Sequence, residues 1–355
     1  MADYFWKAVG SSTDPTVAGN WVNSSGVAYG SEPDSDDIIH FTSGGNKPCN
    51  FTNLTKTYAG MQIHSDIDTG TGVTLDNTDI TLSGDLKFYG SNILTVKNDS
   101  TITFTGSFGN APRVYYPEGS DWEPRNGVFT NSSSRSNLTI IFNGSGSTTF
   151  VHGIYPNITF TGGNLSPTAH TSITNNYNKA SILDFNLGAN CNVQPYSSGA
   201  TSENDLDLHF SIEGELTLTG TSFKWGKCIF ELAPYAANKP FPFDGNIANF
   251  GGGTPKTFRA EYYDLRIIPR GGSKEGYFTL PTGAIINCNS FYLLDNGRIY
   301  GSSSGGGAEI HCVRKPDIKG DWNFQQISKT VYRTIGAKPL LGTPFGGTGL
   351  GDIGT

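Results

Sequence analysis

The chain has 355 residues, and only 15% of them are charged, against roughly 25% in ordinary globular proteins. Its formal net charge is −7 and it has no run of Lys or Arg, which excludes a nucleic-acid backbone as partner because phosphate binding needs basic patches. No segment approaches the roughly 20 apolar residues of a membrane-spanning helix, so we expect no membrane insertion. The N-terminal sequence MADYFWKAVGSS lacks a basic stretch followed by an apolar one, so no secretory signal peptide is expected.

Residues 1–45 predict a module of their own at the start of the chain. Trp6 and Trp21 flank a polar, glycine-containing segment, which is followed by the sequence PDSDDIIHF. A stack of repeats needs a cap over its first turn, and two indoles are suited to that role. An aromatic docking patch is the alternative.

Three carboxylates in this module are candidate calcium ligands: Asp34, Asp36 and Asp37. They lack the Gly and the terminal Glu of an EF-hand loop. Asp also favours turns before strands for purely local reasons. A metal is therefore not the leading interpretation, and no cofactor is expected.

Residues 46–320 predict the body of the protein. The segment 73–106 alternates apolar with polar residues and is interrupted every few residues by Asn, Gly or Asp, and the same style returns at 137–163, 205–220 and 276–300. Such alternation is typical of short, half-buried strands. We predict an all-β fold, namely a right-handed β-helix or a closely related stacked-strand solenoid, with a string of β-sandwiches as the alternative.

Two segments interrupt the alternation and predict inserted loops, at 110–136 and 232–258. In the first, aromatic and basic residues form a candidate binding surface for a glycan or a protein, with local packing as the alternative: Arg113, Tyr115, Tyr116, Trp122 and Arg125. The second is more apolar and predicts a subunit contact, since such a patch would otherwise promote aggregation. Its residues are Tyr235, Phe241, Phe243 and Phe250.

The segment 205–215 holds the one candidate for catalysis. Asp205, Asp207 and Glu213 would share the outer face of a strand, roughly 6.5–7 Å apart between alternate residues. An inverting glycoside hydrolase needs two carboxylates at about that separation. A solvated strand face or a metal site explains the same pattern. Since no other enzyme motif occurs, we expect a protein that is not an enzyme.

The five cysteines, Cys49, Cys191, Cys228, Cys288 and Cys312, form no CxxC pair. The leading interpretation is buried free thiols, and a disulfide or zinc framework is the alternative. The six histidines are scattered singly, without metal-ligand spacing.

Residues 321–355 predict a closing segment and a glycine-rich tail. At 321–336, Phe324, Ile327, Val331 and Ile335 recur at helical spacing, although Val331 lies between two residues, Thr330 and Tyr332, that favour a strand. The final residues, GTPFGGTGLGDIGT, predict an extended tail or linker.

Three stretches together resemble β-helical phage fibres and bacterial adhesins. DYFWKAVGSSTDPTVAGNWVNSSG with PDSDDIIHF is similar to the opening of such proteins, STTFVHGIYPNITFTGG to their repeating units, and FGGTGLGDIGT to a segment that recurs in phage tail fibres. The resemblance implies a phage virion protein, a fibre or an outer decoration, that contributes to host attachment. It would be made in the host cytoplasm, lie on the virion surface beside other virion proteins, form a homotrimer and contact a host surface glycan. A polysaccharide-degrading tailspike and a bacterial surface adhesin are the alternatives.

Overall fold

The computed structural model of the protein is all-β. The structure describes residues 1–8, 12–42, 44–45, 47–64, 72–88, 94–105, 114–115, 135–143, 147–148, 153–161, 164–165, 179–187, 192–193, 208–218, 228–232, 239–240, 259–267, 278–280, 284–293, 298–301, 309–312, 316–318, 321–322 and 329–332. Within these ranges, helical structure is confined to a 3₁₀ turn at Ala18–Asn20 and a short turn at 135–136. The chain forms two compact units, Met1–Gly163 and Asn164–Thr355, and each is described by itself.

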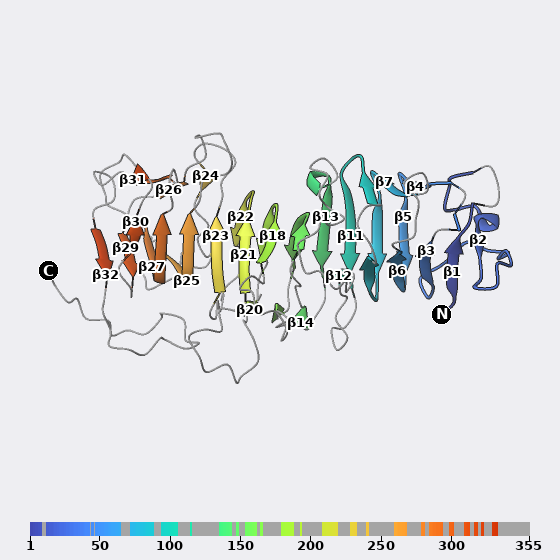
Figure 1. Ribbon diagram of the computed structural model, residues 1–355, viewed down its shortest axis with the longest axis horizontal. Coiled ribbons are helices and arrows are strands. Elements are labelled where there is room, and N and C mark those ends of the chain that lie inside the picture. Colours follow the sequence, from blue (N-terminus) through green and yellow to red (C-terminus); the bar gives the residue numbers. More distant parts are fainter. Residues whose placement is uncertain are drawn as a thin grey trace, which may run out of the picture. The chain divides into compact units, whose positions relative to one another are not determined.

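The strands of the first unit form three sheets (Figure 1). One sheet has the order β12-β9-β6-β3-β1-β2, with the strands β1 Asp3–Trp6, β2 Trp21–Val22, β3 Ile38–Phe41, β6 Gly60–Ile63, β9 Leu86–Phe88 and β12 Val114–Tyr115. The second has the order β10-β7-β4, with β4 Cys49–Thr52, β7 Val73–Asp76 and β10 Leu94–Val96. The third contains β5 Thr55–Tyr58, β8 Asp79–Leu82, β11 Ser100–Phe104, β13 Leu138–Phe142 and β16 Asn157–Phe160. The unit also contains β14 Ser147–Thr148 and β15 Gly153–Tyr155.

The chain passes through the three sheets in turn. It runs through β3, β4 and β5, and then β6, β7 and β8 follow the same course, each pairing in parallel with the strand three positions earlier. The strands β9, β10 and β11 repeat this course a third time. Parallel strands need a crossover connection between them, and here the two intervening strands provide it.

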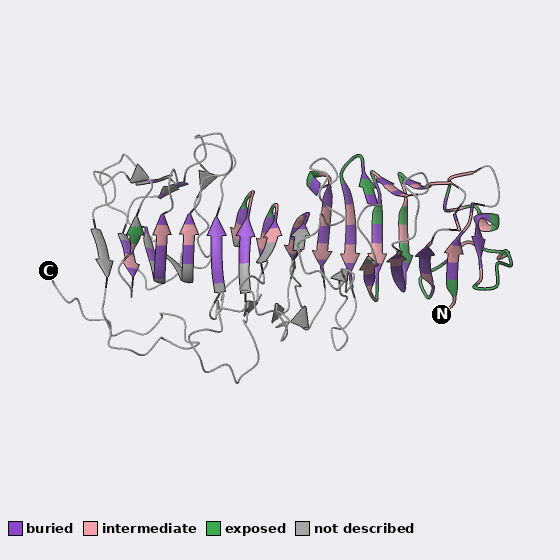
Figure 2. Cartoon of the chain, viewed as in Figure 1, coloured by how far each residue is buried: buried purple, intermediate pink, exposed green. Residues whose placement is uncertain are grey.

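The register between successive turns brings like side chains above one another. Phe104, Phe142 and Phe160 are register partners on β11, β13 and β16. Their rings stack, with centroids 5.2 Å apart for the first pair and 4.5 Å for the second. The alternate residues between them are less buried (Figure 2). Because the side-chain period of a strand is two, this register directs the buried alternate residues, such as Ile102 and Ile140, to the same inner face.

The N-terminal segment adds an antiparallel pair to the first sheet. β1 pairs in parallel with β3 and antiparallel with β2. Trp6 and Trp21 are register partners in the antiparallel pair and both are fully buried. Each indole N–H has a backbone acceptor, 2.9 Å away for Trp6 (the carbonyl of Lys47) and 2.7 Å away for Trp21 (the carbonyl of Pro15). The two largest side chains of the segment therefore bury apolar area without leaving a donor unsatisfied.

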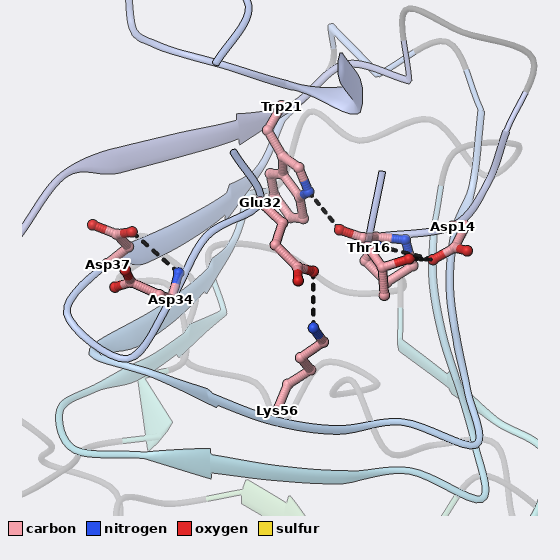
Figure 3. Close-up of polar contacts among 8 residues, drawn as sticks. Asp14, Thr16, Trp21, Glu32, Asp34, Asp37 and Lys56 are labelled. Atoms are coloured by element: carbon pink, nitrogen blue, oxygen red, sulfur yellow. Dashed lines mark hydrogen bonds and ion pairs between the residues drawn. The ribbon is translucent and has the colours of Figure 1, made fainter. Parts of the chain in front are cut away.

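The other two sheets also meet the N-terminal segment at their first strands. On β4, the backbone N–H of Asn50 donates to the carbonyl of Thr13 at 2.8 Å. On β5, the ammonium of Lys56 lies 2.8 Å from the carboxylate of Glu32 (Figure 3). The segment thus contacts the first strand of all three sheets.

The strands of the second unit also pair in parallel. Its main sheet contains, in order, β18 Lys179–Ile182, β21 Leu208–Ile212, β23 Cys228–Leu232, β25 Arg259–Ile267, β27 Ile285–Leu293, β29 Glu309–Cys312 and β32 Lys329–Tyr332, with β30 Asp317–Ile318 beside β27. A second sheet contains β24 Lys239–Pro240, β26 Phe278–Leu280, β28 Arg298–Gly301 and β31 Asp321–Trp322. Two shorter pairs are β19 Phe185–Leu187 with β22 Leu216–Leu218, and β17 Asn164–Leu165 with β20 Asn192–Val193.

The interior of the second unit is built from the same kind of column. Phe210, Phe230, Leu265 and Phe291 are successive register partners on β21, β23, β25 and β27. All four are buried. The core is therefore continuous through these four strands.

Parts of the segments expected as loops or helix form strands. The helical interpretation of 321–336 is wrong at Lys329–Tyr332, which forms β32 and pairs in parallel with β29. The β-propensity of Thr330, Val331 and Tyr332 prevails there over the helical spacing. Within 110–136, Val114–Tyr115 forms β12 and pairs with β9, and within 232–258, Lys239–Pro240 forms β24 and pairs with β26.

Candidate functional site

A polar trough of about 590 Å³ lies along one corner of the first unit. It is formed where the strands of the sheet β10-β7-β4 turn into the sheet that contains β5, β8, β11 and β13. Its lining residues are all polar: Thr52, Asn53, Asp76, Asn77, Asn98, Asp99 and Asn137. Because the turns stack on one another, similar side chains recur at the strand spacing of about 4.8 Å.

The trough owes its shape to two asparagines in the left-handed region. Asn53 has φ 54° and Asn77 has φ 51°, and they occupy corresponding corners 24 residues apart. Among residues with a side chain, Asn tolerates this conformation best because its short amide hydrogen-bonds locally. Each corner therefore turns sharply and directs its amide away from the core.

The side chains of the trough are joined by hydrogen bonds between turns. The amide of Asn77 donates to the side-chain oxygen of Asn53 at 2.7 Å, and the amide of Asn98 donates to the carboxylate of Asp76 at 2.5 Å. The amide of Asn137 donates to a backbone carbonyl of the preceding turn at 2.7 Å. These bonds hold the polar groups in fixed positions before any ligand arrives.

Chemically, the described lining of the trough offers amide, hydroxyl and carboxylate groups, and no aromatic ring is among these residues. It would recognise a ligand by hydrogen bonds to hydroxyl groups and not by stacking. A polyhydroxylated chain such as a polysaccharide has this chemistry. Groups that are already ordered lose little rotamer entropy on binding.

The trough was not among the sites expected from the sequence. The available signal was an Asn or Asp at the end of each strand of one sheet, as in Thr52-Asn53, Asp76-Asn77 and Asn98-Asp99. In a chain this rich in Asn, the signal becomes specific only when the strand register is known.

The candidate metal ligands form a turn. The carboxylate of Asp37 accepts hydrogen bonds from the backbone N–H groups of Ala2 at 2.9 Å and Asp34 at 3.1 Å (Figure 3). The carboxylate of Asp34 accepts one from the backbone N–H of Asp36 at 3.0 Å. Two of the three carboxylates thus order the turn before β3. Among the residues that the structure describes, no group of three or more His, Cys, Asp or Glu is placed to hold a metal ion.

Of the candidate catalytic residues, only Glu213 is described. Its carboxylate accepts a hydrogen bond from the hydroxyl of Ser181. On the next strand, Glu231 is buried and accepts a hydrogen bond from its register partner Ser211 at 2.7 Å. Glu213 itself lies directly after the end of β21. Asp205 and Asp207 lie outside the described residues.

Most of the expected recognition and subunit-contact residues also lie outside the described residues. These are Arg113, Tyr116, Trp122, Arg125, Tyr235, Phe241, Phe243 and Phe250. Tyr115 belongs to β12, where its backbone is described. These expectations stay predictions.

Two of the scattered histidines are brought together on the face of the first sheet. The imidazole of His40 lies 2.8 Å from the carboxylate of Asp3 through Nε2 and 3.5 Å from His64 Nε2 through Nδ1. The ring of Phe5 stacks on His40 with centroids 4.5 Å apart. Pairing in the sheet produces this group, so sequence spacing does not reveal it.

No helix in the described part of the chain has the length and apolarity to span a membrane. Comparisons with protein-family models, with curated proteins and with solved structures found no match.

Proposed function

We propose that this chain is a non-enzymatic structural protein of a bacteriophage virion, a fibre or outer decoration that contributes to host attachment. Its body would be a right-handed β-helix or a closely related stacked-strand solenoid, started by the N-terminal segment. The observation that carries the proposal is the repeated passage of the chain through three parallel sheets in the first unit. Such a body is stiff and presents its side chains at regular intervals.

The pairing pattern supports this architecture over the alternative. β-Sandwiches are built from antiparallel sheets, whereas the strands from β3 onward pair in parallel throughout the described part of the first unit. Connections between parallel strands are nearly always right-handed. The resemblance of residues 1–45 and of the C-terminal tail to phage fibres supports the virion assignment.

The polar trough is our proposed contact for a host surface glycan. The test is binding of the purified chain to immobilised capsular and O-antigen polysaccharides from a panel of bacteria. Asn98→Ala removes a lining amide, and Ser24→Ala, at an exposed position of the N-terminal segment, is the matched control. The proposal requires a polysaccharide that Asn98→Ala binds at least several-fold more weakly than the control does.

Two further measurements separate the alternatives. Release of reducing ends from a bound polysaccharide would favour a tailspike over a non-enzymatic fibre, and the Asp205→Asn, Asp207→Asn double variant would then test the carboxylates. Light scattering after size-exclusion chromatography tests the expected homotrimer, which has a mass of three times 38.0 kDa. A monomer would favour a decoration protein that the particle's own lattice holds in place.

A further inference from the structure

Two cysteines face each other inside the second unit. Cys288 on β27 and Cys312 on β29 are direct register partners on neighbouring parallel strands. Their sulfur atoms lie 3.5 Å apart. Both side chains are buried, with 1% of Cys288 and 3% of Cys312 exposed. We propose that these two thiols are a site of oxidative cross-linking, which joins the two strands by a disulfide.

The backbone geometry suits this bond. Neighbouring strands in a sheet lie about 4.7–4.9 Å apart, and disulfides join Cα atoms about 4.4–6.8 Å apart. The Cα separation of direct register partners on neighbouring strands thus falls within the range that a disulfide joins. The sulfur atoms need to approach by about 1.5 Å to reach the usual bond length of about 2.0 Å.

The described surroundings of the pair combine one polar contact with apolar side chains. The thiol of Cys288 also lies 3.8 Å from the carbonyl of His311, a long hydrogen bond to sulfur. Ile286 and Ile310, register partners one step earlier on the inner face, are buried and apolar. The pair thus lies in a buried environment with apolar neighbours, where a charged thiolate is costly and a neutral disulfide is not.

The reaction balances with a low-molecular-weight disulfide, such as oxidised glutathione, as the oxidant. The thiolate of one cysteine attacks a sulfur of the oxidant and releases one thiol, which gives a mixed disulfide. The second cysteine then attacks the protein sulfur of that bond and releases the second thiol. Two protons and two electrons pass to the oxidant, which leaves as two thiols. Because both sulfur atoms are buried, the first attack requires local opening of the strands and should be slow.

The biological consequence rests on the proposed function. A virion protein is made in a reducing cytoplasm, where thiols stay free, and is later exposed to oxidising surroundings. The pair would then remain reduced during folding and close after release. The bond would close a loop of chain between two cysteines that are 24 residues apart. It would thereby lower the conformational entropy of the unfolded second unit.

The first test maps the cross-link in the purified, fully reduced full-length chain. The chain is incubated with oxidised glutathione below its melting temperature, then denatured, alkylated and digested for mass spectrometry. We expect a linked peptide pair containing Cys288 and Cys312, with a loss of two hydrogen atoms. The inference would be overturned if Cys288 and Cys312 were still reduced, and therefore alkylated, after prolonged incubation. Linkage of either to a different cysteine would also overturn it.

Matched variants then test the consequence. Cys49→Ser is the control, because Cys49 is also a buried free cysteine but its register partner on β7 is Val73. Oxidation should raise the melting temperature of wild type and of Cys49→Ser by several degrees, and leave that of Cys288→Ser unchanged. An equal rise in all three would contradict the inference. If Cys288→Ser does not fold, the peptide map of the wild type still decides. Since neither measurement involves a virion or a glycan, failure here leaves the proposed function untouched, and failure of glycan binding leaves this inference untouched.

Discussion

The indole rings of Trp6 and Trp21 meet edge to face, with centroids 5.1 Å apart and planes inclined at 72°. Trp21 also meets the ring of Phe41 on β3 edge to face at 6.0 Å, so it connects the N-terminal pair to the first turn of the stack. We predict that Trp21→Ala destabilises the first unit by about 3–5 kcal/mol, the usual cost of a large cavity. Chemical denaturation, monitored by tryptophan fluorescence, measures this loss in the free energy of unfolding.

The control for that variant is Val27→Ala. Val27 belongs to the same segment but is 62% exposed, and we expect a change within about 0.5 kcal/mol. If Trp21→Ala costs no more stability than Val27→Ala, the buried indole contributes little to the stability of the unit.

At the corner of Asn77, we predict that a glycine variant is more stable than an alanine variant. Asn77→Gly loses the hydrogen bond to Asn53 but adopts the positive φ without strain. Asn77→Ala loses the same bond and also pays about 1–2 kcal/mol for the left-handed conformation. The alanine variant should therefore unfold at lower denaturant concentration than the glycine variant. Identical midpoints would contradict the role assigned to the backbone conformation.

The all-β class was predictable because the alternation of residues such as Val73 and Leu75 with polar neighbours survives in the structure unchanged. Alternation alone could not decide between the expected parallel solenoid and the alternative β-sandwiches, because it specifies which face of a strand is buried but not which strand lies beside it. The same limit hid the trough and the group around His40. Their members are tens of residues apart and become neighbours only through register.

Near the end of the chain, the spacing of apolar residues indicated a helix where part of the segment forms a strand. Phe324, Ile327, Val331 and Ile335 fit a helical period, yet Val331 lies in β32. With apolar residues so frequent, a helical spacing arises by chance within a short window. The β-branched residues at 330–331 were the better guide, because they describe local backbone preference and not a count of matches.

The corner at Asn77 also holds a buried hydroxyl, which gives another stability test. Thr78 is 1% exposed, and its single hydroxyl proton is shared between the carbonyls of Phe51 at 2.9 Å and Asp76 at 3.1 Å from Oγ1. Thr78→Val keeps the shape and removes the donor, so it should cost about 1–3 kcal/mol. Thr78→Ser keeps the donor and loses one methyl group, at about 0.8 kcal/mol. Urea denaturation of both variants compares the two costs, and a serine variant less stable than the valine variant would refute the hydrogen-bond explanation.

Alkaline pH should destabilise the first unit through Tyr58. Burial raises the pKa of its hydroxyl well above the ordinary value of 10.0, and the neighbouring Cys49 thiol and Glu32 carboxylate raise it further. The unfolded chain therefore loses this proton at a lower pH than the folded chain. The contribution of Tyr58 leaves stability unaffected below about pH 10 and lowers it as the pH rises further, by up to about 1.4 kcal/mol per pH unit.

The measurement is the melting temperature of wild type and of Tyr58→Phe between pH 8 and pH 11.5. The variant should lose less stability than wild type over the upper part of this range, because it has no proton to release at this site. Burial, with a contribution from Asp14, also raises the pKa of Cys49 above 9.0. The melting temperatures of wild type and of Tyr58→Phe should therefore both begin to fall near pH 9. If the melting temperatures of wild type and Tyr58→Phe fall equally over the whole pH range, Tyr58 is not the source of the alkaline destabilisation.

The contacts of the N-terminal segment have a consequence for solubility. A stack of parallel strands ends in rows of backbone N–H and C=O groups that invite another chain to continue the ladder, which is how cross-β fibrils grow. Here the antiparallel β2 follows β1, the carbonyl of Thr13 accepts the N–H of Asn50, and β5 carries the charged Lys56 at its margin. The reversal of direction at β2 is incompatible with a further parallel strand in the same register. The contacts of the N-terminal segment thus cover the strand edges at this end of the first unit and disfavour templated growth of the stack there.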